Sequence, residues 1–128
     1  MKLLTSGPVN KDFADGELVN WHLEIFNNSN ETATTVLTVY TLLGLTPPVE
    51  IGSTFGEINP GQYVFLNIAI DPNQYEHTLP VIEVANDDIL VTLYGRNKDR
   101  KQITGAVYRF SELIEIDGVV TKKTDKKK

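Results

Sequence analysis

The chain contains no cysteine and only two histidines among its 128 residues. Without cysteine it forms no disulfide, offers no thiolate metal ligand and has no cysteine nucleophile. His22 and His77 lie far apart in the sequence, and neither has a second ligand at a spacing typical of zinc sites. We therefore expect a protein that folds on its hydrophobic core alone, with no metal site and no cofactor.

The sequence also lacks the common catalytic motifs. It has neither the G-x-G-x-x-G nor the Walker phosphate-binding pattern, and no G-x-S-x-G nucleophile motif. Four glutamates predicted to lie in strands, Glu24, Glu83, Glu112 and Glu115, leave a small glycan-active hydrolase or lyase as an alternative. Glycosidases need two carboxyl groups held in a deep cleft, which a domain with short loops rarely forms. The sequence therefore favours a protein that is not an enzyme.

Two short acidic segments contain the oxygen ligands that calcium prefers. One holds Asp71, Asn73 and Glu76, and the other spans residues 86–88. Neither follows the EF-hand pattern, and Asn and Asp are common in turns because their side chains bond to nearby backbone groups. We therefore predict turns at both places rather than calcium sites.

No apolar run approaches the roughly 18 residues of a membrane-spanning helix. The N-terminal residues also lack the apolar stretch of about 7–15 residues that a secretory signal needs. We expect no membrane span, and a cytoplasmic or spore-associated protein if the chain begins at its natural N-terminus.

Charge is distributed unevenly along the chain. The last twelve residues hold five lysines and two aspartates, a net charge of +3, so the first 116 carry −8 of the total −5. Nucleic-acid binders carry a basic face on the fold itself, so we expect no nucleic-acid partner. The one basic strip within the folded part spans residues 95–101, where Asp99 interrupts the positive charges. We predict a charged hairpin tip there, a single domain over residues 1–117 and a flexible lysine-rich tail over 118–128.

Alternation of apolar and polar residues is the dominant pattern. It is clearest over residues 19–25 and 63–70, and turn residues separate the alternating segments. Seven or eight short strands at roughly ten-residue spacing predict an all-β antiparallel sandwich, immunoglobulin-like or jelly-roll-like. Trp21 is expected in its core. Residues 32–43, apolar on both faces, predict a central strand or one covered by a loop or partner.

Three further segments carry specific expectations. Residues 44–61 are rich in Pro and Gly and predict a long connection with at most a short strand at 49–53. Pro80 cannot donate to a β-ladder, which favours an edge strand over residues 78–85. Residues 103–116 predict one last strand, with a bulge near 107–110 where the alternation changes parity.

Two glycosylation-type triplets begin at Asn27 and Asn30. Such triplets mark exposed loops in exported proteins, whereas Asn, Ser and Thr also gather in ordinary turns. The sequence leaves open whether either asparagine is ever modified.

Residues 19–70 weakly resemble bacterial immunoglobulin-like domains. The resemblance rests on a strand ending in an Asn-rich turn ("LEIFNNSNETATTVLTVY"), a long loop, and a Pro-Gly turn before an alternating strand ("EINPGQYVFLNIAI"). The C-terminal part, "ILVTLYGRNKDRKQITGAVYRFSELIEI", looks like small proteins of spore-forming Firmicutes. These resemblances imply a structural or surface-layer role.

Tyr63 and Phe65 alternate out of phase with the aliphatic side chains of their strand. Either a loop covers them or they face outward, as aromatic residues at interfaces do. The sequence favours a structural or protein-interaction domain, bacterial and surface- or spore-associated, that uses these two residues for a protein partner or for self-association. The alternative is a carbohydrate-binding module with Tyr63, Phe65, Tyr94 or Tyr108 as sugar platform.

Overall fold

A computed structural model describes residues 1–121 and shows an all-β protein. Its only helical element within those residues is a 3₁₀ turn, η1 (Phe110–Glu112). The strands are β1 (Lys2–Thr5), β2 (Val9–Asn10), β3 (Asp12–Phe13), β4 (Gly16–Glu17), β5 (Asn20–Asn27), β6 (Ala33–Thr41), β7 (Val49–Ile58), β8 (Tyr63–Ala69), β9 (His77–Val84), β10 (Ile89–Arg96), β11 (Gln102–Arg109) and β12 (Ile114–Ile116).

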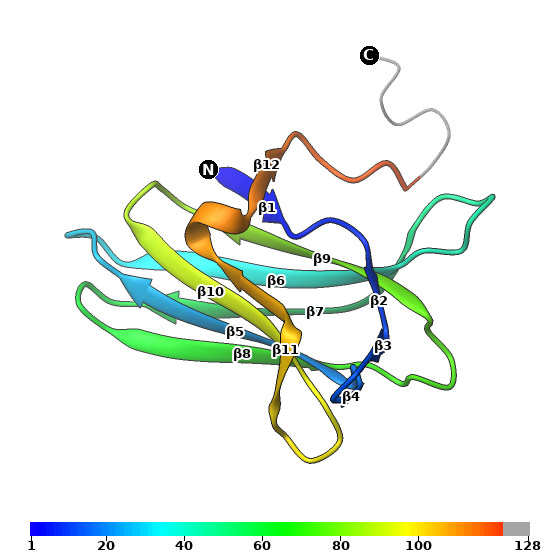
Figure 1. The fold of residues 1–128 in the computed structure, drawn as a ribbon. Helices are drawn as coiled ribbons and strands as arrows, with labels where there is room; N and C mark the ends of the chain where they lie inside the picture. Colours follow the sequence, from blue (N-terminus) through cyan, green and yellow to red (C-terminus); the bar gives the residue numbers. More distant parts are fainter. Residues whose placement is uncertain (122–128) are drawn as a thin grey trace.

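The strands form two main antiparallel sheets. One has the order β12-β1-β9-β6-β7, with β2 also paired to β9, and the other has the order β11-β10-β5-β8. The two sheets lie one behind the other (Figure 1), and β3 and β4 form a small separate hairpin. From β5 to β10 the chain crosses between the sheets after β5, β7, β8 and β9, so each sheet pairs strands that are distant in the sequence, such as β5 with β8 and β6 with β9, as well as one hairpin of consecutive strands, β6–β7 or β10–β11.

The inward faces of both sheets share one hydrophobic core. Trp21, Leu23 and Ile25 of β5 pack there with Leu37 of β6 and Ile82 of β9, and each is at most 1% exposed. The Trp21 indole N–H donates to Thr78 Oγ1 at 3.0 Å, so its one polar group is satisfied. The prediction that Trp21 lies in the core is confirmed, as is the central position of β6 between β9 and β7. Truncating Trp21 to alanine would cost about 3–5 kcal/mol.

The long connection predicted for residues 44–61 is wrong, because β7 occupies ten of them. Gly52 and Gly56 resemble strand breakers in the sequence, yet both point inward against β8. A Cβ on Gly52 would lie 3.1 Å from Ile68 Cγ2, and one on Gly56 would lie 3.4 Å from Leu66 Cδ2. The glycines therefore let the edges of the two sheets approach closely.

The strand that contains Pro80 is not an edge strand as predicted, because β9 lies between β1 and β6. The Pro80 carbonyl accepts a hydrogen bond from Thr5 Oγ1 at 2.6 Å, so this side of the residue faces the place where β1 ends. β2 pairs with β9 only at His77 and Thr78, so it does not reach Pro80. Since a residue in a strand directs its N and C=O to the same side, Pro80 needs no ladder hydrogen bond there.

The single last strand predicted over residues 103–116 is also wrong. The chain leaves the four-stranded sheet after β11, turns at η1 and enters the six-stranded sheet as β12. The pairing between β10 and β11 shifts between Gln102 and Val107, which is earlier than the predicted bulge. The change of parity thus reflects an irregular ladder and a transfer between sheets.

The N-terminal residues form β1, a strand that the sequence reading did not predict, and Leu4 is 5% exposed in the core. Of the predicted tail, residues 122–128 lie outside the described residues. Val119 is partly buried and lines a hollow of about 180 Å³ on the outer face of the six-stranded sheet, together with Leu3 and Val36. The segment after β12 therefore lies against the outer face of the six-stranded sheet.

Candidate functional site: the outer face of the four-stranded sheet

Alternation along β5, β8 and β10 directs one set of side chains away from the core. These side chains are Asn20, His22, Glu24 and Phe26 of β5, Tyr63, Phe65 and Asn67 of β8, and Leu90, Thr92, Tyr94 and Arg96 of β10. The antiparallel register aligns them in rows across the sheet. We call this surface the outer face.

The first row is apolar and exposed. Tyr63 lies opposite Phe26, which lies opposite Leu90, and Phe65 follows Tyr63 on the same strand. The exposed fractions are 55% for Tyr63, 56% for Phe65, 38% for Phe26 and 41% for Leu90. Tyr63 and Phe65 are therefore not covered by a loop. We call these four residues the aromatic row.

A groove of about 330 Å³ runs beside the aromatic row. Phe26, Tyr63 and Leu90 line it, and Glu24 and Arg109 place opposite charges along it. Burial and the neighbouring Glu24 carboxylate raise the pKa of Tyr63 above its ordinary value. The groove thus combines an apolar wall with polar groups.

His22 lies on the face predicted for it, but it is not a surface histidine, because only 2% of it is exposed. Its ring lies between Phe65 and Tyr94, with centroid distances of 5.3 Å and 4.7 Å. The sequence showed which way His22 points, and cross-strand register determines that two aromatic rings cover it.

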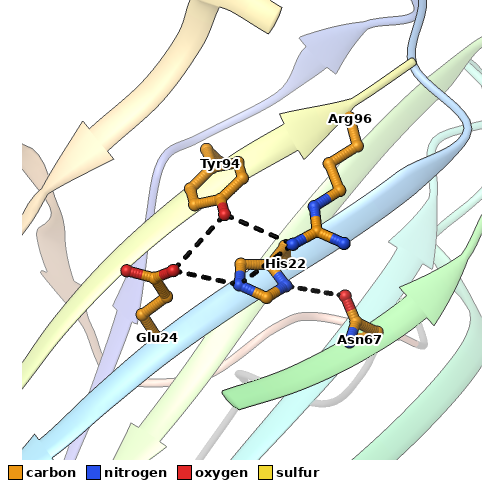
Figure 2. Close-up of polar contacts among 5 residues, drawn as sticks. All are labelled: His22, Glu24, Asn67, Tyr94 and Arg96. Atoms are coloured by element: carbon orange, nitrogen blue, oxygen red, sulfur yellow. Dashed lines mark hydrogen bonds and ion pairs between the residues drawn. The ribbon is translucent and has the colours of Figure 1, made fainter. Parts of the chain in front are cut away.

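The His22 ring is held by hydrogen bonds from three strands (Figure 2). Nδ1 lies 2.8 Å from Asn67 Oδ1, while Nε2 lies 3.2 Å from Glu24 Oε2 and 3.5 Å from Arg96 Nη2. The Tyr94 hydroxyl donates to Glu24 Oε2 at 3.3 Å and accepts from Arg96 Nη2 at 3.4 Å. We call these five residues the polar ladder.

The polar ladder gives the ring a partner in either charge state. Asn67 Oδ1 accepts a hydrogen from Nδ1, a neutral ring then accepts from Arg96 through Nε2, and a protonated ring donates to Glu24 instead. Because both ring nitrogens are occupied and the ring is buried, His22 positions its neighbours and offers no accessible base. The ladder therefore holds the middle of the outer face in one conformation.

Beyond the ladder the outer face becomes positively charged. A hollow of about 420 Å³ lies where β10 runs into the hairpin tip. Three cations and three amides line it: Arg96, Lys98 and Arg100 with Asn20, Asn67 and Asn97. We call it the cationic hollow. The basic strip predicted as a hairpin tip does form one, because Arg100 N donates to Asn97 O at 2.9 Å across the turn.

The four glutamates proposed for glycan cleavage are not brought together. Glu24 lies on the outer face, whereas Glu83 of β9 lies on the outer face of the opposite sheet. Glu112 belongs to η1 rather than to a strand, and its carboxylate accepts a hydrogen bond from Arg109 N. Glu115 lies 3.7 Å from Lys2 Nζ. The structure shows no carboxyl pair facing a common cleft among these four residues.

Both acidic segments form turns stabilised by their own side chains. Asp71 Oδ1 accepts from Asn73 N at 2.9 Å, and Asn86 Oδ1 accepts from Asp88 N at 2.8 Å. Within residues 1–121 no three His, Asp or Glu side chains form a group that could hold a metal ion. The second histidine, His77, contacts Asn10 and Glu76, well apart from His22.

The four tyrosines and phenylalanines considered as a sugar platform divide between the two sides of the sheet. Tyr63, Phe65 and Tyr94 lie on the outer face, but Tyr108 is packed against the core with its ring 6.3 Å from Trp21. Burial raises the pKa of Tyr108, consistent with this inward position. The platform therefore excludes Tyr108. Phe26 and Leu90 complete it, and their parity opposite to the core residues of β5 and β10 could have identified them.

The two asparagine triplets have different environments. Asn27 is fully buried, and its amide donates to Glu31 O and Ile58 O, both at 2.8 Å. Its Oδ1 accepts from Ser29 N and Ser29 Oγ. Asn30 is exposed. Asn27 therefore closes the β5–β6 turn, and in the folded protein only Asn30 is accessible to a modifying enzyme.

No protein-family model matches the chain, and neither a curated protein nor a solved structure shows significant similarity to it. Among the described residues there is no helix of the length and apolarity needed to cross a bilayer.

Proposed function

We propose that the protein is a non-catalytic interaction domain, an immunoglobulin-like β-sandwich whose outer face binds a protein partner. The aromatic row carries this proposal, because four large apolar side chains side by side on a sheet form the kind of patch found at protein interfaces. Crossing of the chain between the sheets, which pairs β5 with β8 and β6 with β9, supports the immunoglobulin-like arrangement.

Two properties of the outer face favour binding over catalysis. His22 is buried with both ring nitrogens in contact with other side chains, and the nearby Glu24 has no second carboxylate beside it in the polar ladder. The ladder also holds the aromatic side chains in place before any partner arrives, which lowers the entropic cost of binding. A second copy of the chain is the simplest partner.

The experiment is sedimentation velocity over a concentration series. The double variant Tyr63→Ser, Phe65→Ser removes the exposed rings and should abolish self-association. Phe55→Ser is the matched control, since Phe55 is 70% exposed on the outer face of the other sheet. Association that survives in the double variant, or that Phe55→Ser weakens equally, contradicts the proposal. A wild-type protein that stays monomeric at every concentration removes self-association.

Carbohydrate binding is a second candidate. It is favoured by the position of Tyr63 and Phe65 beside the hydrogen-bonding groups of Glu24 and Asn67, since sugar sites combine a ring face with polar side chains. A glycan array probed with wild type and the double variant tests it. A signal lost in the double variant and kept in Phe55→Ser supports carbohydrate binding, and an array without signal removes it.

A further inference from the structure

The cationic hollow concentrates positive charge on a protein whose first 116 residues are strongly acidic. Arg96, Lys98 and Arg100 line it and no carboxylate does. None of the three forms an ion pair with another described residue. The acidic side chains of this end, including Asp15 and Asp99, line an adjacent hollow of about 380 Å³ that shares Val19, Asn97 and Lys98 with the cationic hollow. The three cations therefore point into the hollow without a direct ion pair to the described residues.

The hollow is built on fixed groups. The Arg96 guanidinium lies 5.6 Å from the Tyr94 ring centroid and donates to its hydroxyl, so the polar ladder orients it. Asn97 Oδ1 accepts from Asp99 N and Lys101 N, which sets the shape of the tip that carries Lys98 and Arg100. The planar guanidinium of an arginine held in one orientation suits carboxylate and phosphate groups, because it can donate two parallel hydrogen bonds to them.

The wall of the hollow also contains polar groups that the protein does not fully use. Asn20 Oδ1 is buried with no hydrogen-bond partner in the described part of the chain, but as an acceptor it would not contact an oxyanion, so only the amide N–H groups of Asn20 can contribute. Asn67 uses Oδ1 for His22, which leaves its amide N–H groups as donors. The hollow thus offers three cationic donors and the neutral amide donor of Asn67 at one place.

We propose that the cationic hollow is a binding site for an oxyanion, a carboxylate, sulfate or phosphate group. This inference does not depend on the aromatic row, which lies at the other end of β5 and β10. A ligand that reached both places would bear an acidic group next to an apolar or ring-shaped part.

The test is an NMR titration of the ¹⁵N-labelled full chain with inorganic phosphate, at constant ionic strength maintained with chloride. Saturable shifts confined to the backbone of the tip and to the side-chain amides of Asn20 and Asn67 are expected. Parallel titrations with sulfate, D-glucuronate and N-acetylglutamate amide distinguish a free inorganic ion from a carboxylate carried by a sugar or a peptide.

Lys98→Gln and Arg100→Gln should each raise the dissociation constant about two- to fivefold, as expected for one exposed charge contact. Lys101→Gln is the matched control, because Lys101 belongs to the same tip, carries the same charge and does not line the hollow. The spectrum of each variant, compared with that of the wild type before titration, serves as the control that the fold is kept. Absent or unsaturable shifts, or equal weakening by Lys101→Gln, would overturn the proposal.

The double variant Phe26→Ser, Leu90→Ser separates this inference from the proposed function, because both side chains belong to the aromatic row, whereas Phe65 packs on His22 of the polar ladder that orients Arg96. It should leave the phosphate titration unchanged while abolishing association through the aromatic row. Loss of phosphate binding in that variant would contradict an independent anion site.

Discussion

The buried amide of Asn27 provides a sharp test of the structure. In Asn27→Asp the shape is kept and the acceptor for Ser29 remains, but both donors are lost, so the Ile58 carbonyl loses the Asn27 amide and the Glu31 carbonyl keeps only the Ser29 hydroxyl. Each buried carbonyl left unsatisfied costs about 1–3 kcal/mol. The Ile58 carbonyl alone predicts a loss of about 1–3 kcal/mol, to which the repulsion between the new carboxylate and the carbonyl oxygens adds.

The assay is urea denaturation at neutral pH, with Asn30→Asp as the matched control. Asn30 is exposed three residues away, so the same change there should alter the free energy of unfolding by at most about 0.5 kcal/mol. The penalty at Asn27 should shrink as the pH is lowered, because a protonated carboxyl regains one donor. Equal, small effects at both positions would refute the claim that the buried Asn27 side chain stabilises the β5–β6 turn through its hydrogen bonds to the backbone.

Two further predictions concern other parts of the fold. Gly95→Ala should lower the free energy of unfolding by about 1–3 kcal/mol in thermal melts, because its Cβ would lie 2.6 Å from Leu18 Cδ1, whereas Gly118→Ala, with open space around it, should be neutral. Lys2 Nζ lies 2.8 Å from Asp87 Oδ1 and lowers the pKa of Asp87. This pair therefore stabilises the fold above the unfolded-state pKa of Asp87, and the stabilisation is lost as the pH falls through the lower folded-state pKa. Asp87→Asn should therefore lower the melting temperature at neutral pH and have no effect in strong acid, and a difference that grew in acid would contradict the pairing.

The sequence predicted most strands because burial imposes a period of two wherever one face of a strand meets the core. The strand predictions failed where the local propensity of a residue points to one structure and its tertiary contacts require another. Gly52 and Gly56 indicate a loop by propensity, but they are needed where β7 meets β8. Pro80 indicates an edge strand, but its missing N–H falls at the gap between β1 and β2.

The candidate site was predictable only in part, for a related reason. Parity along β8 was enough to direct Tyr63 and Phe65 outward. Assembly of the polar ladder depends on which strands are neighbours, since His22 meets Asn67 and Tyr94 only because β5 lies between β8 and β10. Asn67 and Tyr94 are 45 and 72 residues away from His22 in the sequence, and pairing between such distant strands leaves no signal in the alternation pattern of a single strand.

The central claim is that the outer face of the four-stranded sheet is the contact surface of the protein. The most direct measurement follows amide chemical shifts of the ¹⁵N-labelled chain as its concentration is raised from dilute solution to the limit of solubility. The account predicts concentration-dependent changes on β5, β8 and β10, centred on Tyr63 and Phe65. Changes centred on Phe55 of the opposite sheet would contradict it, and spectra that are the same at every concentration would contradict self-association through this face.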